Sequence, residues 1–177
     1  MVSFPGHVVV AAAVDRPWVD SWMGTDDDLS APLSPRFLGG LEARLGMTAG
    51  SLDAVLLAPR AAGAPAVPLS PILDSDHPRV VRARRYRDDV RVWTCGPAVL
   101  VLGRGLGGRW EAAVEVAEDA RNEGLGRSLA AAARHLVPEG RPVWAQVAPG
   151  NAASLRAFLA AGYAPVGAEV LFMPATR

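Results

Sequence analysis

The stretch RNEGLG, residues 121–126, decides the fold of this chain. It follows an apolar run at Trp110–Val116 that alternates as a strand does, and it opens a segment whose leucines recur every three or four residues. Two glycines let a ligand come close to the backbone, and the free N–H groups of a first helical turn attract anions. Arg121 adds a positive charge suited to phosphate. The stretch predicts either a diphosphate-binding loop or a glycine-rich helix start without a ligand.

The segments around this stretch predict an α/β fold (α+β mixed) with a mixed sheet. Meandering antiparallel strands precede a βαβ crossover, so helices are expected against the sheet. The predicted strands are Val8–Val14, Leu52–Ala58, Val90–Cys95, Ala98–Gly103, Trp110–Val116, Val143–Ala148 and Glu169–Met173. The predicted helices are Pro35–Leu45, the leucine-rich segment that begins at residue 125, and Asn151–Ala161. Residues 59–78 are expected to be loop, and the arginines of Val80–Tyr86 to lie on an exposed strand face.

Length and composition limit the classes of protein. A chain of 177 residues is the size of one domain, so we expect a single domain over 1–177, with a variable part at 1–78 and a core at 79–177. The chain has no lysine and a net charge of zero, which excludes a Walker-A loop or a Schiff-base lysine and ranks nucleic acid last among partners. One cysteine and three scattered histidines predict no metal site. No apolar run approaches the ~20 residues of a membrane helix, so we expect a cytoplasmic protein without membrane contact.

A second glycine motif competes with the first. Gly103–Gly108 matches G-x-G-x-x-G after a strand, which is the pattern of a dinucleotide fold and of an NAD(P)-dependent oxidoreductase. That motif must open a helix, however, and the residues after Gly108 alternate as a strand. Too little chain remains for a dinucleotide domain. We interpret Gly103–Gly108 as a hairpin turn.

Arg121, Gly124 and Gly126 resemble the R/Q-x-x-G-x-G/A loop of the GNAT superfamily of acyl-CoA-dependent N-acetyltransferases. The strand, asparagine, helix and Gly-aromatic pair that end at Gly162-Tyr163 are similar to the family's downstream segment. The resemblance covers about residues 90–172. It implies a GNAT-like sheet that splays open between Trp110–Val116 and Val143–Ala148, with helices on both faces.

The resemblance also implies that acetyl-CoA is the cosubstrate. Its pantetheine arm is expected between the splayed strands, and its diphosphate on the amides of the 121–127 loop. The residues expected to bind it are Val114, Val116, Arg121, Asn122, Glu123, Gly124, Leu125, Gly126, Arg127, Asn151, Ser154 and Phe158. Glu123 places a negative charge in this loop, so it is expected to lower CoA affinity if it faces inward.

The implied reaction is direct attack of a primary amine on the acetyl thioester in a ternary complex, which requires an acceptor for the amine proton. Glu115 is the preferred catalytic base and Glu111 its substitute; burial in the cleft with a raised pKa would support that role. The family's proton-donating tyrosine is replaced here by Phe158. The chain is therefore predicted to be an acyltransferase that acts on a small-molecule or peptide amine, with a homodimer left open. A non-catalytic acyl-CoA-binding module is the alternative, ahead of an oxidoreductase.

Overall fold

The computed structural model describes residues 1–23 and 31–174, which form two compact units. The larger unit is Val55–Pro165, and the smaller unit combines Met1–Ala54 with the chain from Val166 onward. Strands β3 (Met47–Ala58) and β9 (Ala164–Pro174) contribute residues to both units. The acidic triplet Asp26–Asp28, which the sequence predicts as a solvated turn or as an attractant for a cationic amine, lies outside the described residues. The expectation of a single domain stays a prediction.

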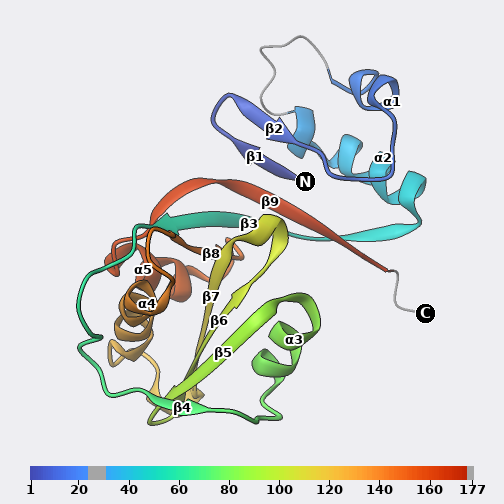
Figure 1. Ribbon diagram of the computed structural model, residues 1–177. Coiled ribbons are helices and arrows are strands. Elements are labelled where there is room, and N and C mark those ends of the chain that lie inside the picture. The colour runs from blue at the N-terminus through green and yellow to red at the C-terminus, as the bar shows by residue number, and fades with distance from the viewer. Residues whose placement is uncertain (24–30, 175–177) are drawn as a thin grey trace. The chain divides into compact units, whose positions relative to one another are not determined.

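The larger unit is built on a mixed sheet whose strands follow the order β3-β8-β7-β6-β5-β4 (Figure 1). Strands β4 to β7 pair in antiparallel fashion, whereas β7 and β8 are parallel. This mixture confirms the predicted fold class. The strand bounds are β4 Ser70–Ile72, β5 Asp88–Cys95, β6 Ala98–Arg104, β7 Trp110–Val116 and β8 Val143–Val147.

Helices cover both faces of this sheet (Figure 1). On one face lies α3 (Pro78–Tyr86), whose buried Val80 and Ala83 pack against Val92 and Val101 of the sheet. On the other lie α4 (Leu125–Leu136) and α5 (Ala152–Ala160). Alternate residues of β7 therefore face different helices, because successive side chains of a strand point to opposite faces.

The predicted strand at Val80–Tyr86 is wrong, because this segment is the helix α3. Pro78 occupies the first turn, where it suits a helix, and the His77 ring nitrogen accepts a hydrogen bond from the Arg79 amide at 3.2 Å. Val80 and Ala83, three residues apart, then lie on one buried side of the helix. The arginines separated by these apolar residues gave the segment an apparent alternation.

Three other expectations need correction. The strand predicted at Val8–Val14 is limited to β2 (His7–Val9) and is half-buried to exposed, because it pairs with β1 (Val2–Phe4) at the edge of the sheet. The 59–78 segment contains the short strand β4. The closing strand β9 is longer than the predicted Glu169–Met173.

The smaller unit has a core of its own. Its helices are α1 (Arg16–Asp20) and α2 (Pro35–Leu45), and its strands follow the order β2-β1-β9-β3. Ser34 caps α2 by accepting from the Phe37 amide at 3.2 Å, and Gly46 ends it with φ +63°. Phe37 and Leu41 are buried against the two tryptophans of the α1 region, Trp18 and Trp22.

Gly103–Gly108 lies in the hairpin between β6 and β7, as predicted. Arg104 pairs with Trp110 in an antiparallel register, and the turn holds only the short 3-10 helix Leu106–Gly108. No α-helix begins there, so this motif lacks the helix N-terminus that a dinucleotide fold requires.

Candidate functional site

The larger unit contains a cavity of about 490 Å³ where β7 diverges from β8. The two strands pair through Trp110–Val143 and Glu111–Trp144, at their first residues. Farther along β7, Val114 and Val116 line the cavity instead of pairing with β8. The structure thus has the opening that was predicted between these strands.

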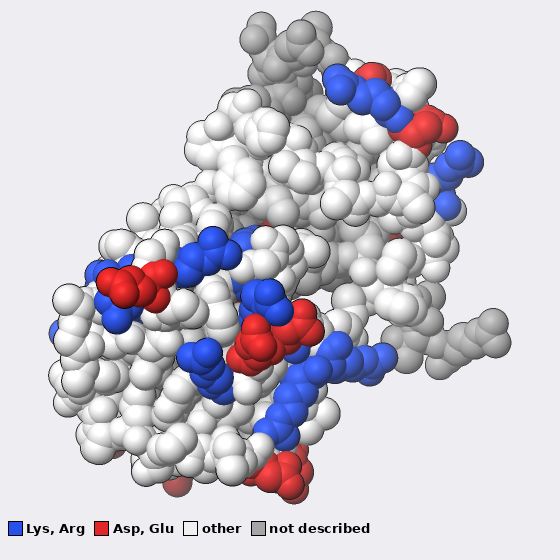
Figure 2. Space-filling view, in the orientation of Figure 1, with Lys and Arg blue, Asp and Glu red and all other residues white. Residues whose placement is uncertain are grey.

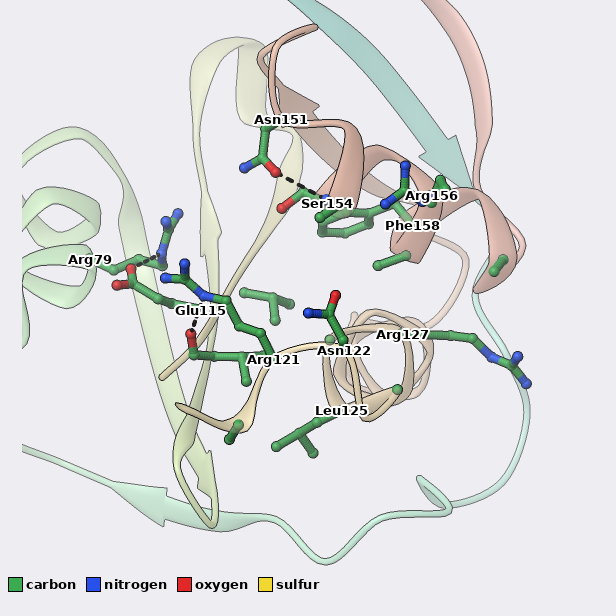
Figure 3. Close-up of a pocket in the computed structure, with 18 residues that line it drawn as sticks. Arg79, Glu115, Arg121, Asn122, Leu125, Arg127, Asn151, Ser154, Arg156 and Phe158 are labelled. Carbon is green, nitrogen blue, oxygen red and sulfur yellow. Dashed lines mark hydrogen bonds and ion pairs between the residues drawn. The ribbon is translucent and has the colours of Figure 1, made fainter. Parts of the chain in front are cut away.

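Nearly all the residues predicted to bind the cosubstrate meet at this cavity (Figure 3). The predicted residues that line it are Val114, Val116, Arg121, Asn122, Gly124, Leu125, Gly126, Arg127, Asn151, Ser154 and Phe158. Glu123 is exposed and does not line the cavity. Their role in binding stays a prediction.

The loop before α4 has the backbone of an anion-binding loop. Asn122 and Gly124 have φ values of +68° and +84°, a left-handed conformation that asparagine tolerates and glycine adopts freely. No side chain in the described part of the protein caps the first turn of α4, so its amides are left for a ligand. A Cβ added at Gly126 would meet only Val116 and Ala157, at 3.7 and 3.9 Å. Packing therefore does not require a glycine at 126, and its missing side chain leaves room in the cavity.

A second helix also begins at the cavity. Asn151 caps α5, since its side-chain oxygen accepts from the Ser154 amide at 3.0 Å, and both residues line the cavity wall. The positive ends of two helix dipoles, those of α4 and α5, are thus directed at one space. Such an arrangement suits a ligand with several negative charges.

Among the described residues, four arginines line the cavity: Arg79, Arg121, Arg127 and Arg156. The Arg121 side chain is held by a hydrogen bond from its Nε to the Val116 carbonyl oxygen, at 3.2 Å. Sequence reasoning missed Arg79 and Arg156. The signal for Arg156 was its place between Ser154 and Phe158 on a helix already assigned to the site. Arg79 could be found only through the fold, because α3 brings it to β7.

Glu115 is the one carboxylate among the described residues that lines the cavity. Its Oε2 accepts from Arg79 Nε at 2.7 Å, and both side chains are 40% exposed (Figure 3). The Arg79 hydrogen bond lowers the pKa of Glu115; burial opposes this shift, and the charges of Arg79, His77 and Arg121 reinforce it. Glu115 is therefore ionised at neutral pH. The base role of Glu115 stays a prediction, without the support that a raised pKa would give.

Glu111 is in a different environment. Its side chain is 5% exposed, and Arg87 Nε and Arg109 Nη2 each contact one of its oxygens at 2.9 Å. Gln146 Nε2 donates to the same carboxylate at 3.3 Å. Glu111 does not line the cavity, so the structure does not bring the substitute base together with the other predicted residues.

Phe158 is buried and presents its ring to the cavity, as an apolar wall. It packs edge-on against Tyr163, with ring centroids 4.9 Å apart. The Tyr163 hydroxyl donates to the Ala130 carbonyl oxygen at 3.1 Å, and burial raises the pKa of this phenol. Tyr163 does not line the cavity, so it does not replace the proton donor that is missing at position 158.

A mixed sheet with helices on both faces is consistent with a GNAT-like fold. Residues 111–170, about a third of the chain, match the family described as FR47-like protein, a family of GNAT-type acetyltransferases. The match runs from β7 through α4 and α5 into β9, so this part of the chain is similar to GNAT-type acetyltransferases. No curated protein matches the chain. Among the described residues, none of the helices is long and apolar enough to span a membrane.

Proposed function

We propose that the protein transfers an acetyl group from acetyl-CoA to a primary amine. The observation that carries this proposal is the convergence of two helix N-termini, a glycine-lined loop and three arginines, Arg121, Arg127 and Arg156, on one cavity beside the open edge of β7. The donor set suits acetyl-CoA, which carries a diphosphate and a further phosphate. In this proposal the amides of residues 122–127 hold the diphosphate, and Val114–Val116 border the pantetheine arm.

Acetyl-CoA supplies an acetyl thioester when it is bound. The amine nitrogen attacks the thioester carbonyl carbon, the carbon–sulfur bond breaks, sulfur leaves with the electron pair and is protonated, and the amine loses one proton. The residues of the chain bind and orient the reactants. Glu115 is ionised and lines the cavity, so its carboxylate can contact the acceptor. Its lowered pKa makes it a weak base, so we propose that the amine proton passes to solvent.

Release of free CoA thiol in the presence of acetyl-CoA and a panel of primary amines tests the proposal. We expect thiol release that depends on the amine, together with a higher melting temperature in CoA. Because the chain has no lysine, acetylation of its own side-chain amines cannot imitate turnover. A rise in melting temperature without turnover on any amine would instead indicate a non-catalytic acyl-CoA-binding module. Stabilisation by NAD(P)H and not by CoA would contradict both.

A further inference from the structure

The charges around Glu115 do not suit a simple amine. Its carboxylate is already paired with Arg79 at 2.7 Å, and Arg121 lies close enough to lower its pKa. Two guanidinium groups thus surround one carboxylate at this end of the cavity (Figure 3). An ammonium ion that approaches Glu115 would gain one attraction and meet two repulsions.

The Arg79–Glu115 pair is nevertheless easy to separate. Both side chains are 40% exposed, and an exposed pair contributes little to stability. Within residues 1–23 and 31–174, Arg79 donates through its Nε alone and Glu115 accepts through its Oε2 alone, so each has further hydrogen-bonding positions for a ligand. The Glu111 carboxylate offers a contrast, since arginines hold both its oxygens in a nearly enclosed place.

We propose that the acceptor is an amino acid, whose ammonium group binds Glu115 while its carboxylate binds Arg79. This inference rests on the proposed acetyl transfer and narrows the acceptor to amines with a carboxylate a few bonds away. The incoming charges exchange partners with the resident pair, so that every charge stays matched. A guanidinium group binds a carboxylate through two parallel hydrogen bonds, which also orients the amine. Alkylamines and amines on residues inside a peptide chain lack the neighbouring carboxylate.

Matched acceptors provide the test. We would measure kcat/KM for amino acids and for their primary amides, at equal concentrations of unprotonated amine, with the unmodified protein. The amides keep the amine and the side chain but lose the negative charge. We expect the amino acids to be preferred by about tenfold, the effect of one charge-assisted contact. Equal rates, or faster rates with the amides, would overturn the inference.

Two variants assign the preference to a residue. In Arg79→Gln the ratio of kcat/KM for an amino acid to kcat/KM for its amide should fall close to one. In Arg82→Gln this ratio should stay the same as in the unmodified protein. Arg82 is the matched control because it is an exposed arginine on the same helix, stacked on Tyr86 and absent from the cavity wall. A preference that survives Arg79→Gln contradicts the inference. Glu115→Gln provides an independent check. It should lower kcat/KM for amino acids and for amides alike, because both carry the ammonium group.

Binding separates this inference from the proposed reaction. The rise in melting temperature with CoA should be the same in all variants, which shows that they fold and keep the CoA site. If no acceptor is turned over, acetyl transfer fails, but calorimetric titration of the CoA-loaded protein with the same pairs still decides the inference. Tighter binding of amino acids that Arg79→Gln abolishes supports it, and equal binding overturns it.

Discussion

Arg79 and Arg87, at the two ends of α3, pair with the two glutamates on one face of β7: Arg79 with Glu115 and Arg87 with Glu111. Eight helical residues rise about 12 Å, and four strand residues span about 13 Å, so the two spacings match. The helix therefore runs antiparallel to the strand. One pair is enclosed and the other is open to the cavity, which gives them different roles.

The buried Arg87–Glu111 pair should contribute more to stability than the exposed Arg79–Glu115 pair. Glu111→Gln leaves Arg87 and Arg109 without their carboxylate in a buried place, which we expect to lower the free energy of unfolding by about 3–5 kcal/mol. Glu115→Gln, at a 40% exposed position, should lower it far less. Urea unfolding of the two variants measures the difference. Similar losses in both would contradict the distinction.

The open pair should make stability depend on pH. Arg79 lowers the pKa of folded Glu115, so the pair contributes above the unfolded pKa of about 4.3 and is lost as the pH falls through the folded value. Arg79→Gln should therefore lower the melting temperature at pH 7 and have a smaller effect near pH 3. The charges of His77 and Arg121 also lower the pKa of Glu115. The Arg82→Gln variant keeps all of these charges and removes a different arginine, so its melting temperature serves as the reference at each pH. A constant difference across the pH range would count against this cause.

Substitutions at Gly126 should change CoA affinity and leave the fold intact. Gly126→Ala adds a Cβ with ordinary contacts to Val116 and Ala157, so the ligand-free protein should keep its stability. Gly126→Glu adds a carboxylate to a loop that is suited to anions, so CoA affinity should fall at least about 100-fold while the fold persists. Calorimetry with CoA and circular dichroism measure both properties. Unchanged affinity in Gly126→Glu would exclude this loop as the diphosphate site.

Tyr163 should support the structure and not the chemistry. Tyr163→Phe removes the buried hydrogen bond to the Ala130 carbonyl, which we expect to cost about 1 kcal/mol. Turnover should stay within about twofold, because the hydroxyl does not reach the cavity. Thermal unfolding and the rate of thiol release test this together. A large loss of turnover at normal stability would instead make Tyr163 the proton donor.

The part of the fold from β5 onward was predictable because its signals are local. The leucine spacing of α4, the Asn151 cap of α5 and the glycine turns each act within a few residues. The predicted cavity residues followed from these elements, since Gly124 and Asn151 begin the two helices that meet there.

The errors arose where distant residues decide the structure. The helical state of α3 depends on burying Val80 and Ala83 against the sheet, although His77 and Pro78 were local signals of its start. Glu111 and Glu115 share one strand face, and their sequence neighbours do not show which of them is enclosed by arginines. Arginines 24 and 36 residues away, Arg87 and Arg79, made one of them structural and left the other at the cavity.

The early separation of β7 from β8 places a strand edge inside the sheet. Open edges usually lie at the periphery, where they can recruit a strand from another molecule and begin aggregation. Here the edge borders a cavity lined by residues of α4 and α5, so its backbone amide and carbonyl groups are open to an extended ligand instead. The chain thereby has a hydrogen-bonding edge within its sheet and not at the periphery.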